Sequence, residues 1–225
     1  MKRSFLDMAV GLAGLAGFAV VTALVVSGVS QTVDLQAVLA VNHYDLGPVG
    51  TSLMVLLTTY GREVVWSLLV IIMFLIGSKR TKLLAMELAV LFVAGIVVGE
   101  FAKIAIDRMR PSMAAGIIYR ITGSPTDLLA YPSGHALIVS IGAAFCLARF
   151  HRWIIAFLLA VEAALVCYSR VYVGVHYPLD VTGGILLGIA IALLGAQLIE
   201  KYLSSILERL LEPILLVLKD GPLDV

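Results

Sequence analysis

Three short polar clusters interrupt an otherwise apolar chain, and their residue types suit the binding of phosphate. The clusters are KIAIDRMRP (Lys103–Pro111), YPSGH (Tyr131–His135) and SRVYVGVHYPLD (Ser169–Asp180). They contribute three cations, Lys103, Arg110 and Arg170. The two arginines carry planar sets of donors that match phosphate oxygens. Together these residues predict a site for a tetrahedral oxyanion.

The second cluster lies where a helix is expected to begin. Ser133 is a candidate N-cap, and Gly134 allows a ligand to approach the backbone closely. The start of a helix presents free N–H groups and a partial positive charge, so it binds anions. A Ser-Gly pair alone is usually only a cap, but beside three cations it predicts part of a phosphate site.

Two histidines accompany the cations. His135 lies in the first turn of the expected helix, and His176 precedes Pro178, which suits a first helical position. Asp180 lies about one turn further on and can hold one nitrogen of His176, leaving the other free to attack or to accept a proton. A second, protonated histidine can donate a proton to a leaving alkoxide. The set describes phosphoryl transfer through a phosphohistidine.

The chain offers no cluster of carboxylates for divalent metals. We therefore expect neither a metal nor a cofactor, and we expect the three cations to stabilise the charge of the transition state. The two cysteines, Cys146 and Cys167, lie in apolar runs without metal-site spacing. They are interpreted as reduced packing residues.

The composition indicates a membrane protein. Of the 225 residues, 61% are hydrophobic and 14% are charged, whereas a typical soluble domain has about 45–50% and about 25%. The net charge of +1 gives no reason to expect a nucleic-acid partner.

Six segments are candidates for spanning helices, which need about 20 mostly apolar residues. They are Phe5–Val29, Val64–Gly77, Leu83–Ile106, Gly134–Arg149, Trp153–Ser169 and Leu179–Ile199. We predict an all-α integral membrane bundle of six transmembrane helices in one domain, residues 1–225, with its motif region at 103–180. An interfacial segment is expected at 30–61 and an amphipathic cytoplasmic tail at 200–225. Alternatively, Val49–Gly77 forms one long tilted helix, or a further short segment brings the number of spans to seven.

The basic residues predict the orientation, because cytoplasmic loops are enriched in Lys and Arg. The six-helix arrangement places ten of them on one side and six on the other. The loops Asp107–Pro132 and Ser169–Tyr177 then face outward, on the extracytoplasmic side of a cell membrane. Two helices separate these loops, so they share a face whatever the number of spans before them. A single juxtamembrane Lys or Arg more often anchors a helix, so the predicted site rests on this convergence.

The three clusters resemble the motifs of the type 2 phosphatidic acid phosphatase (PAP2) family, whose catalytic pattern is shared with bacterial acid phosphatases and vanadium haloperoxidases. The family pattern is KxxxxxxRP, PSGH and SRxxxxxHxxxD. Here it stands as Lys103-x6-Arg110-Pro111, Pro132-Ser133-Gly134-His135 and Ser169-Arg170-x5-His176-x3-Asp180. Every fixed position matches in order, and the six-helix layout extends the likeness over most of the chain.

The resemblance implies a role for each matched residue. His176 would be the nucleophile that forms a phosphoenzyme, Asp180 its orienting partner, and His135 the group that protonates the leaving group. The substrate-binding residues would be Lys103, Arg110, Arg170, Ser133 and Gly134. The family needs no metal.

We therefore expect a metal-independent membrane phosphatase acting on a phosphomonoester or diphosphate of a lipid at the outer interface. Candidate substrates are phosphatidic acid, phosphatidylglycerol phosphate, and polyprenyl phosphate or diphosphate. A phosphotransferase on the same scaffold would pass the phosphate to an acceptor other than water. A non-enzymatic transporter would not need the intact histidines, and a vanadate-dependent peroxidase fits least because the chain is small and membrane-embedded.

Two further carboxylates, Glu87 and Glu162, fall within apolar runs. Ionisable groups at membrane depth are functional candidates by default. For Glu162, a hydrogen bond between helices is the favoured interpretation. The sequence specifies neither the lipid nor the oligomeric state.

Overall fold

The computed structural model describes residues 2–111, 116–121, 128–218 and 220–225. The helices are α1 (Lys2–Val26), α2 (Gln31–Asn42), α3 (Gly47–Leu56), the π-helix η1 (Leu57–Val65), α4 (Trp66–Ile76), α5 (Lys79–Ile106), α6 (Gly134–Arg149), α7 (Trp153–Tyr172), α8 (Pro178–Tyr202) and α9 (Ser204–Leu218). The described residues form no β-strand beyond two isolated bridges.

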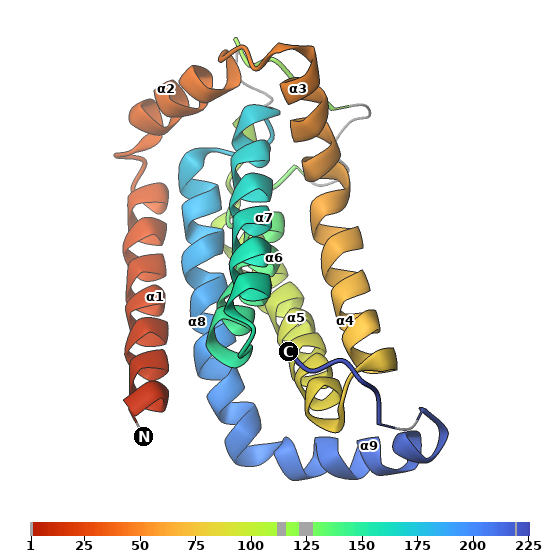
Figure 1. The fold of residues 1–225 in the computed structure, drawn as a ribbon. Coiled ribbons are helices and arrows are strands. Elements are labelled where there is room, and N and C mark those ends of the chain that lie inside the picture. The colour runs from red at the N-terminus through yellow and green to blue at the C-terminus, as the bar shows by residue number, and fades with distance from the viewer. Residues whose placement is uncertain (1, 112–115, 122–127, 219) are drawn as a thin grey trace.

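Five helical segments are long and apolar enough to cross a membrane, and α6 is a shorter apolar helix of 16 residues. The two groups together confirm the predicted all-α membrane bundle of six helices. Figure 1 shows these six running roughly parallel, with α6 and α8 in the middle and α1 on the outer side of α8.

The second span is longer than the main prediction, because α3, η1 and α4 form one continuous helical segment, Gly47–Ile76. The segment at residues 30–61, expected at the interface, is therefore divided between two helical elements. Residues 31–42 form the separate helix α2, whereas residues 47–61 belong to the long segment, as in the alternative considered from the sequence. A Cβ on Gly61 would collide with Val166 of α7, so glycine at this position lets η1 pack closely against α7.

Close packing of α6 against α8 places the starts of these two helices side by side. A Cβ on Gly184 would lie 2.6 Å from the Ser133 carbonyl oxygen, and one on Gly188 would lie 2.6 Å from the Leu137 carbonyl oxygen. At both positions only glycine, whose side chain is a single hydrogen atom, permits the two helices to come this close. As a result, the Ser133 N–H donates to the Asp180 carbonyl at 2.9 Å.

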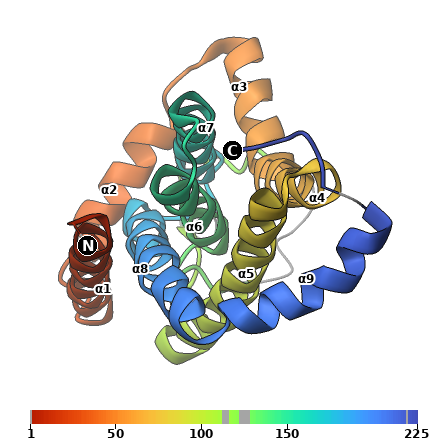
Figure 2. The same cartoon turned by 60° about the horizontal axis from the view of Figure 1, so that its bottom comes forward.

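The two ends of the bundle carry different short helices. In Figures 1 and 2, α2 lies across the end where α6 and α8 begin, and α9 lies across the opposite end. After α9 the chain returns to the start of α5, where the Leu223 carbonyl accepts a hydrogen bond from the Ser78 N–H at 2.7 Å. The expected tail helix is thus α9, and its contact with a membrane surface stays a prediction.

Candidate active site

His176 lies in the loop between α7 and α8 and is almost completely buried. Gly174, with φ of 83°, turns the chain back after α7. Arg110 donates from Nη1 to His176 Nε2 at 3.0 Å. Since Nε2 accepts this bond, the proton of a neutral imidazole is on Nδ1, and Nδ1 faces Asp180 Oδ2 at 3.5 Å. We call His176 and Asp180 the inner pair.

The contact of the inner pair is longer than a hydrogen bond, and Nδ1 of His176 has no hydrogen-bond partner within the described part of the chain. The predicted partners are therefore adjacent without being hydrogen-bonded in the free protein. Catalytic hydrogen bonds are often long before substrate binds and tighten afterwards.

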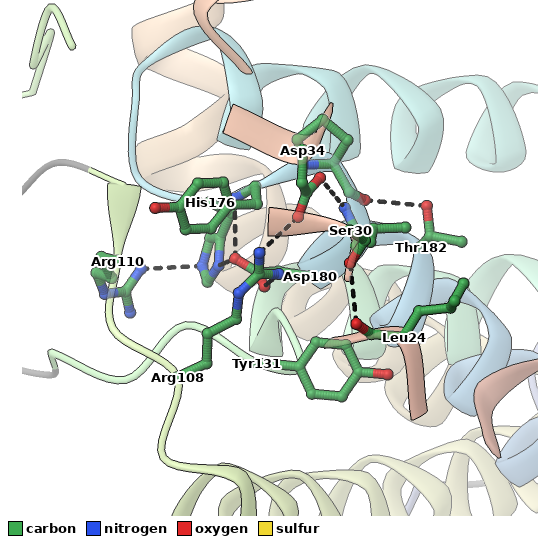
Figure 3. A network of polar contacts seen from close by, with 12 residues as sticks. Leu24, Ser30, Asp34, Arg108, Arg110, Tyr131, His176, Asp180 and Thr182 are labelled. Atoms are coloured by element: carbon green, nitrogen blue, oxygen red, sulfur yellow. Dashed lines mark hydrogen bonds and ion pairs between the residues drawn. The ribbon is translucent and has the colours of Figure 1, made fainter. Parts of the chain in front are cut away.

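Asp180 is fully buried and is held by a network that the motifs do not include (Figure 3). Arg108 donates to Asp180 Oδ1 and to Asp34 Oδ2, at 2.6 Å each. The Tyr177 N–H donates to Asp180 Oδ2 at 2.8 Å, and the Leu179 N–H donates to Asp34 Oδ1 at 3.0 Å. A buried carboxylate stays ionised only when charge and hydrogen bonds compensate its lost hydration. Arg108 places a positive charge against both aspartates.

The surroundings of His176 lower its pKa well below the ordinary value of 6.5. Burial is the largest cause, because the charged form loses hydration, and the positive charges of Arg110 and Arg170 add to it. The imidazole is therefore neutral at neutral pH, which is the form that can act as a nucleophile.

All three predicted cations are brought to this end of the bundle, and each is buried. Arg170, in the last turn of α7, donates from Nη1 to Thr58 Oγ1 at 2.6 Å and to the Thr58 carbonyl at 3.2 Å. Lys103, in the last turn of α5, donates to Glu100 Oε1 at 3.0 Å. Arg110 joins them through His176. The three cations thus come to this end from three separate segments, and their binding of an oxyanion stays a prediction.

The start of α6 behaves as the sequence predicts. Ser133 is the N-cap, and its Oγ accepts a hydrogen bond from the Ala136 N–H at 3.5 Å. A Cβ on Gly134 would lie 3.8 Å from Arg62 Nη1 and 3.9 Å from Lys103 Nζ. The N–H groups at this helix start are therefore flanked by cations, which reinforces the attraction for an anion.

His135 has a carboxylate neighbour of its own, which the motifs do not include. Its Nε2 lies 3.6 Å from Glu63 Oε1, and the side chains are 16% and 46% exposed. We call His135 and Glu63 the outer pair. Glu63 also forms an ion pair with Arg62. Both residues belong to η1, and π-helical segments are rare and frequently lie at functional sites. The signal in the sequence was an ionisable pair inside an apolar run.

A cavity of about 400 Å³ opens beside Gly134 and extends between η1, α4, α5 and α6. Its polar end is formed by Arg62, Glu63, Glu100 and Gly134, and its deeper walls are Trp66, Ser67, Phe92, Gly95, Ile96, Gly99, Leu137 and Ile138. Apart from Ser67, these deeper walls carry no polar side chain other than the indole N–H of Trp66, which is bonded to Glu162. The cavity therefore suits a molecule with a charged head and an apolar chain.

Glu87 and Glu162 take no part in the site as the structure describes it. Glu162 accepts a hydrogen bond from Trp66 Nε1 at 3.0 Å, which joins α7 to α4 and confirms the interhelical interpretation. Glu87 interacts electrostatically with Arg149 and Glu200, away from the histidines. Among the described residues, no group of three or more His, Cys, Asp or Glu side chains has the arrangement of a metal site.

Known proteins are similar to this chain in sequence and in fold. The chain is 46% identical over 146 residues to an undecaprenyl-diphosphatase of Sulfolobus acidocaldarius, covering 65% of this chain and 69% of the relative. It is 30% identical over 145 residues to a putative undecaprenyl-diphosphatase of Escherichia coli, covering 64% and 71%. The crystal structure of a PAP2 type phosphatidylglycerolphosphate phosphatase from Bacillus subtilis superposes with a TM-score of 0.68 at 23% identity, covering 85% of this chain and 96% of that one.

The family match covers the whole motif region. Residues 83–203 match the model of the PAP2 superfamily, and this range contains every predicted catalytic and phosphate-binding residue. The chain therefore belongs to the PAP2 superfamily and is a multi-pass membrane lipid phosphatase of that family.

Proposed function

We propose that this protein hydrolyses a polyprenyl diphosphate to the monophosphate, with His176 as the nucleophile and without a metal ion. The observation that carries the proposal is a cavity whose polar end is formed by Arg62, Glu63 and the start of α6, where Glu63 meets His135. The inner pair and the three cations lie at the same end of the bundle. Two relatives named as undecaprenyl-diphosphatases support the diphosphate over the other candidate lipids.

The first chemical step uses the inner pair. Nε2 of His176 attacks the terminal phosphorus, and Arg110, which contacts Nε2 in the free protein, moves its donors onto the phosphate oxygens. A bond forms between Nε2 and phosphorus while the bond from phosphorus to the bridging oxygen breaks. The phosphohistidine ring becomes cationic, and the carboxylate of Asp180 beside Nδ1 stabilises it.

The outer pair carries out the proton transfers of both steps. The electron pair of the broken bond stays on the bridging oxygen of the lipid monophosphate, and His135 donates a proton there. In the second step His135 takes a proton from water, whose oxygen attacks phosphorus and releases inorganic phosphate and neutral His176. Glu63 lies 3.6 Å from His135 and stabilises the imidazolium that alternates with the neutral ring.

The cations and the helix start stabilise the charge that develops on the transferring group. Arg110, Arg170 and Lys103, with Ser133 and the N–H of Gly134, bind its non-bridging oxygens. Arg108 has a different task, because it contacts Asp180 and Asp34. It holds the Asp180 carboxyl in place, and we assign it as a positioning residue.

We further propose that the site faces away from the cytoplasm of a cell membrane. The basic side chains Lys79, Arg80, Lys82, Arg149, Arg152 and Lys201 belong to the helix ends and loops opposite the site, and cytoplasmic ends are enriched in such residues. In right-side-out vesicles, hydrolysis of a substrate supplied outside without detergent supports this orientation, and hydrolysis only after permeabilisation contradicts it.

Phosphate release by the purified protein in detergent tests the activity. The panel is a polyprenyl diphosphate, the corresponding monophosphate, phosphatidic acid and phosphatidylglycerol phosphate, each with and without EDTA. We expect the highest kcat/KM on the polyprenyl diphosphate, no effect of EDTA and inhibition by vanadate. A strict requirement for a divalent metal, or consumption of substrate without free phosphate, would contradict the proposal.

A further inference from the structure

A fourth cation, Arg62, lies beside the three that the motifs contain. Its Nη1 and the Nζ of Lys103 lie within 4 Å of the same point, the position of a Cβ on Gly134. Arg62 interacts electrostatically with both His135 and Arg170. It comes from η1 within a spanning segment, where an ionisable side chain is rare and has a functional role by default.

Arg62 lies on the side of the proton donor rather than that of the nucleophile. Its neighbour Glu63 contacts both Arg62 and His135. The strongest charges on His135 are those of Arg170 and Arg62, whereas the strongest on His176 are those of Arg110 and Arg170. Arg62 is therefore placed where the leaving group departs.

The leaving group of a diphosphate differs in charge from that of a monoester. Cleavage of a lipid phosphomonoester releases an alcohol, which is neutral once protonated. Cleavage of a lipid diphosphate releases a phosphate monoester, which keeps negative charge after the bond from phosphorus to the bridging oxygen has broken. A guanidinium beside the proton donor stabilises the second leaving group far more than the first.

The cavity continues from this point in the direction that the lipid must take. Arg62 and Glu63 form its polar end, and Trp66 and Phe92 lie deeper along α4 and α5. A lipid chain attached to the leaving phosphate passes Arg62 before it reaches the apolar walls. The order along the site is transferred phosphate, leaving phosphate, lipid chain.

We infer that Arg62 forms a subsite for the second, lipid-linked phosphate of a diphosphate substrate. The inference rests on the proposed function and specifies how the site distinguishes diphosphates from monophosphates. Before substrate binds, the carboxylate of Glu63 holds the guanidinium at the subsite. The substrate oxygens then share or replace that carboxylate.

The test compares kcat/KM for a polyprenyl diphosphate and for the monophosphate of the same lipid, in the wild type, Arg62→Gln, Arg62→Lys and the control Arg120→Gln. Arg120 is an arginine at the same end of the bundle, but its guanidinium stacks on Tyr172 and donates to the Tyr172 carbonyl. We expect Arg62→Gln to lower the diphosphate-to-monophosphate ratio roughly 30-fold, the loss typical of a charge-assisted hydrogen bond. Arg62→Lys restores part of the ratio, and Arg120→Gln keeps it.

A binding measurement tests the subsite in variants whose turnover is too slow to measure. Methylenediphosphonate, whose P–C–P link cannot be hydrolysed, and inorganic phosphate are each tested for raising the thermal unfolding temperature of the detergent-solubilised protein. We expect Arg62→Gln to lose the shift by methylenediphosphonate and to keep the shift by phosphate. Equal losses for both ligands, or an unchanged kcat/KM ratio, would overturn the subsite while leaving the proposed activity standing. Wild-type turnover of the monophosphate but not the diphosphate would overturn both.

Discussion

The inner and outer pairs use the same chemistry, a histidine beside a carboxylate, in opposite environments. Asp180 is fully buried and bonded to Arg108 and the Tyr177 N–H, whereas Glu63 is 46% exposed and lies at the mouth of a cavity. His176 is 1% exposed and His135 is 16% exposed on the side chain. The two histidines are therefore differentiated by their surroundings rather than by their residue type.

The difference follows from what each step requires. A nucleophile must be neutral and held in one orientation, which burial and a rigid ion network provide. A group that donates a proton and later takes one from water needs access to solvent and a partner that tolerates both charge states. The buried network around Asp180 is held by contacts from α2, from the segment that carries Arg108 and from the start of α8, whereas the outer pair is a single contact between η1 and α6.

Replacing the nucleophile should have the largest effect on activity of any change to the two pairs. His176→Ala should lower kcat for phosphate release roughly 10⁴-fold or more, because no other group can form the phosphoenzyme. The variant should still bind vanadate, since the cations and the start of α6 are unchanged. His135→Ala is the matched control and should retain more activity, because water can supply a proton. Equal residual activity in both variants would contradict the assigned roles.

Removing the support of Asp180 should have the next largest effect. Arg108→Gln leaves two buried aspartates without their shared cation, so one of them takes up a proton. We expect kcat to fall roughly 100-fold with little change in KM, since the orienting carboxylate is lost but the phosphate cations remain. Activity should rise again with pH as the carboxyl deprotonates, and Arg108→Lys should restore part of it.

A loss for Arg108→Gln that does not change with pH would indicate a purely structural role. Asp34→Asn sharpens the test, because it removes the competing carboxylate and keeps the bond from Arg108 to Asp180. This variant should keep more activity than Arg108→Gln. The other groups around Asp180 are His176, Tyr131 and Tyr177, and none of them changes in either variant.

The outer pair should be less sensitive, because its carboxylate is half exposed and screened by solvent. Glu63→Gln should lower kcat for phosphatidic acid roughly tenfold, since departure of an alkoxide depends on proton donation. The loss should be smaller with p-nitrophenyl phosphate, whose leaving group needs little protonation. A larger loss than for Arg108→Gln would reverse the ranking of the two pairs.

The smallest effect concerns the pH dependence of the wild type. Since the pKa of His176 is lowered, its neutral form persists as the pH falls through 6.5. The acid limb of kcat/KM should therefore lie below pH 6.5, with a loss of less than about threefold between pH 7 and 5.5. An unshifted histidine would lose roughly tenfold at one unit below its pKa. An acid limb of kcat/KM at or above pH 6.5 would contradict the conclusion that burial lowers the pKa of His176.

Much of the fold could be predicted because hydrophobic length and composition report on the membrane directly. The span Gly47–Ile76 was only one of two alternatives, since Thr58, Arg62 and Glu63 interrupt its apolar run. These polar residues looked interfacial in isolation. In the fold Thr58 contacts Arg170, Glu63 contacts His135 and Arg62 pairs with Glu63, so the site accounts for these polar residues.

The sequence by itself determined the motif residues, their order and the end of the bundle at which they meet. These features can be read from the sequence, because the motif spacing and the number of apolar segments between the motifs are visible along the chain. Only the tertiary structure decided that Asp34 and Arg108 support Asp180, and that Arg62 and Glu63 lie beside His135. These contacts join residues from different helices and loops, and no local pattern encodes which surfaces the packed helices bring together.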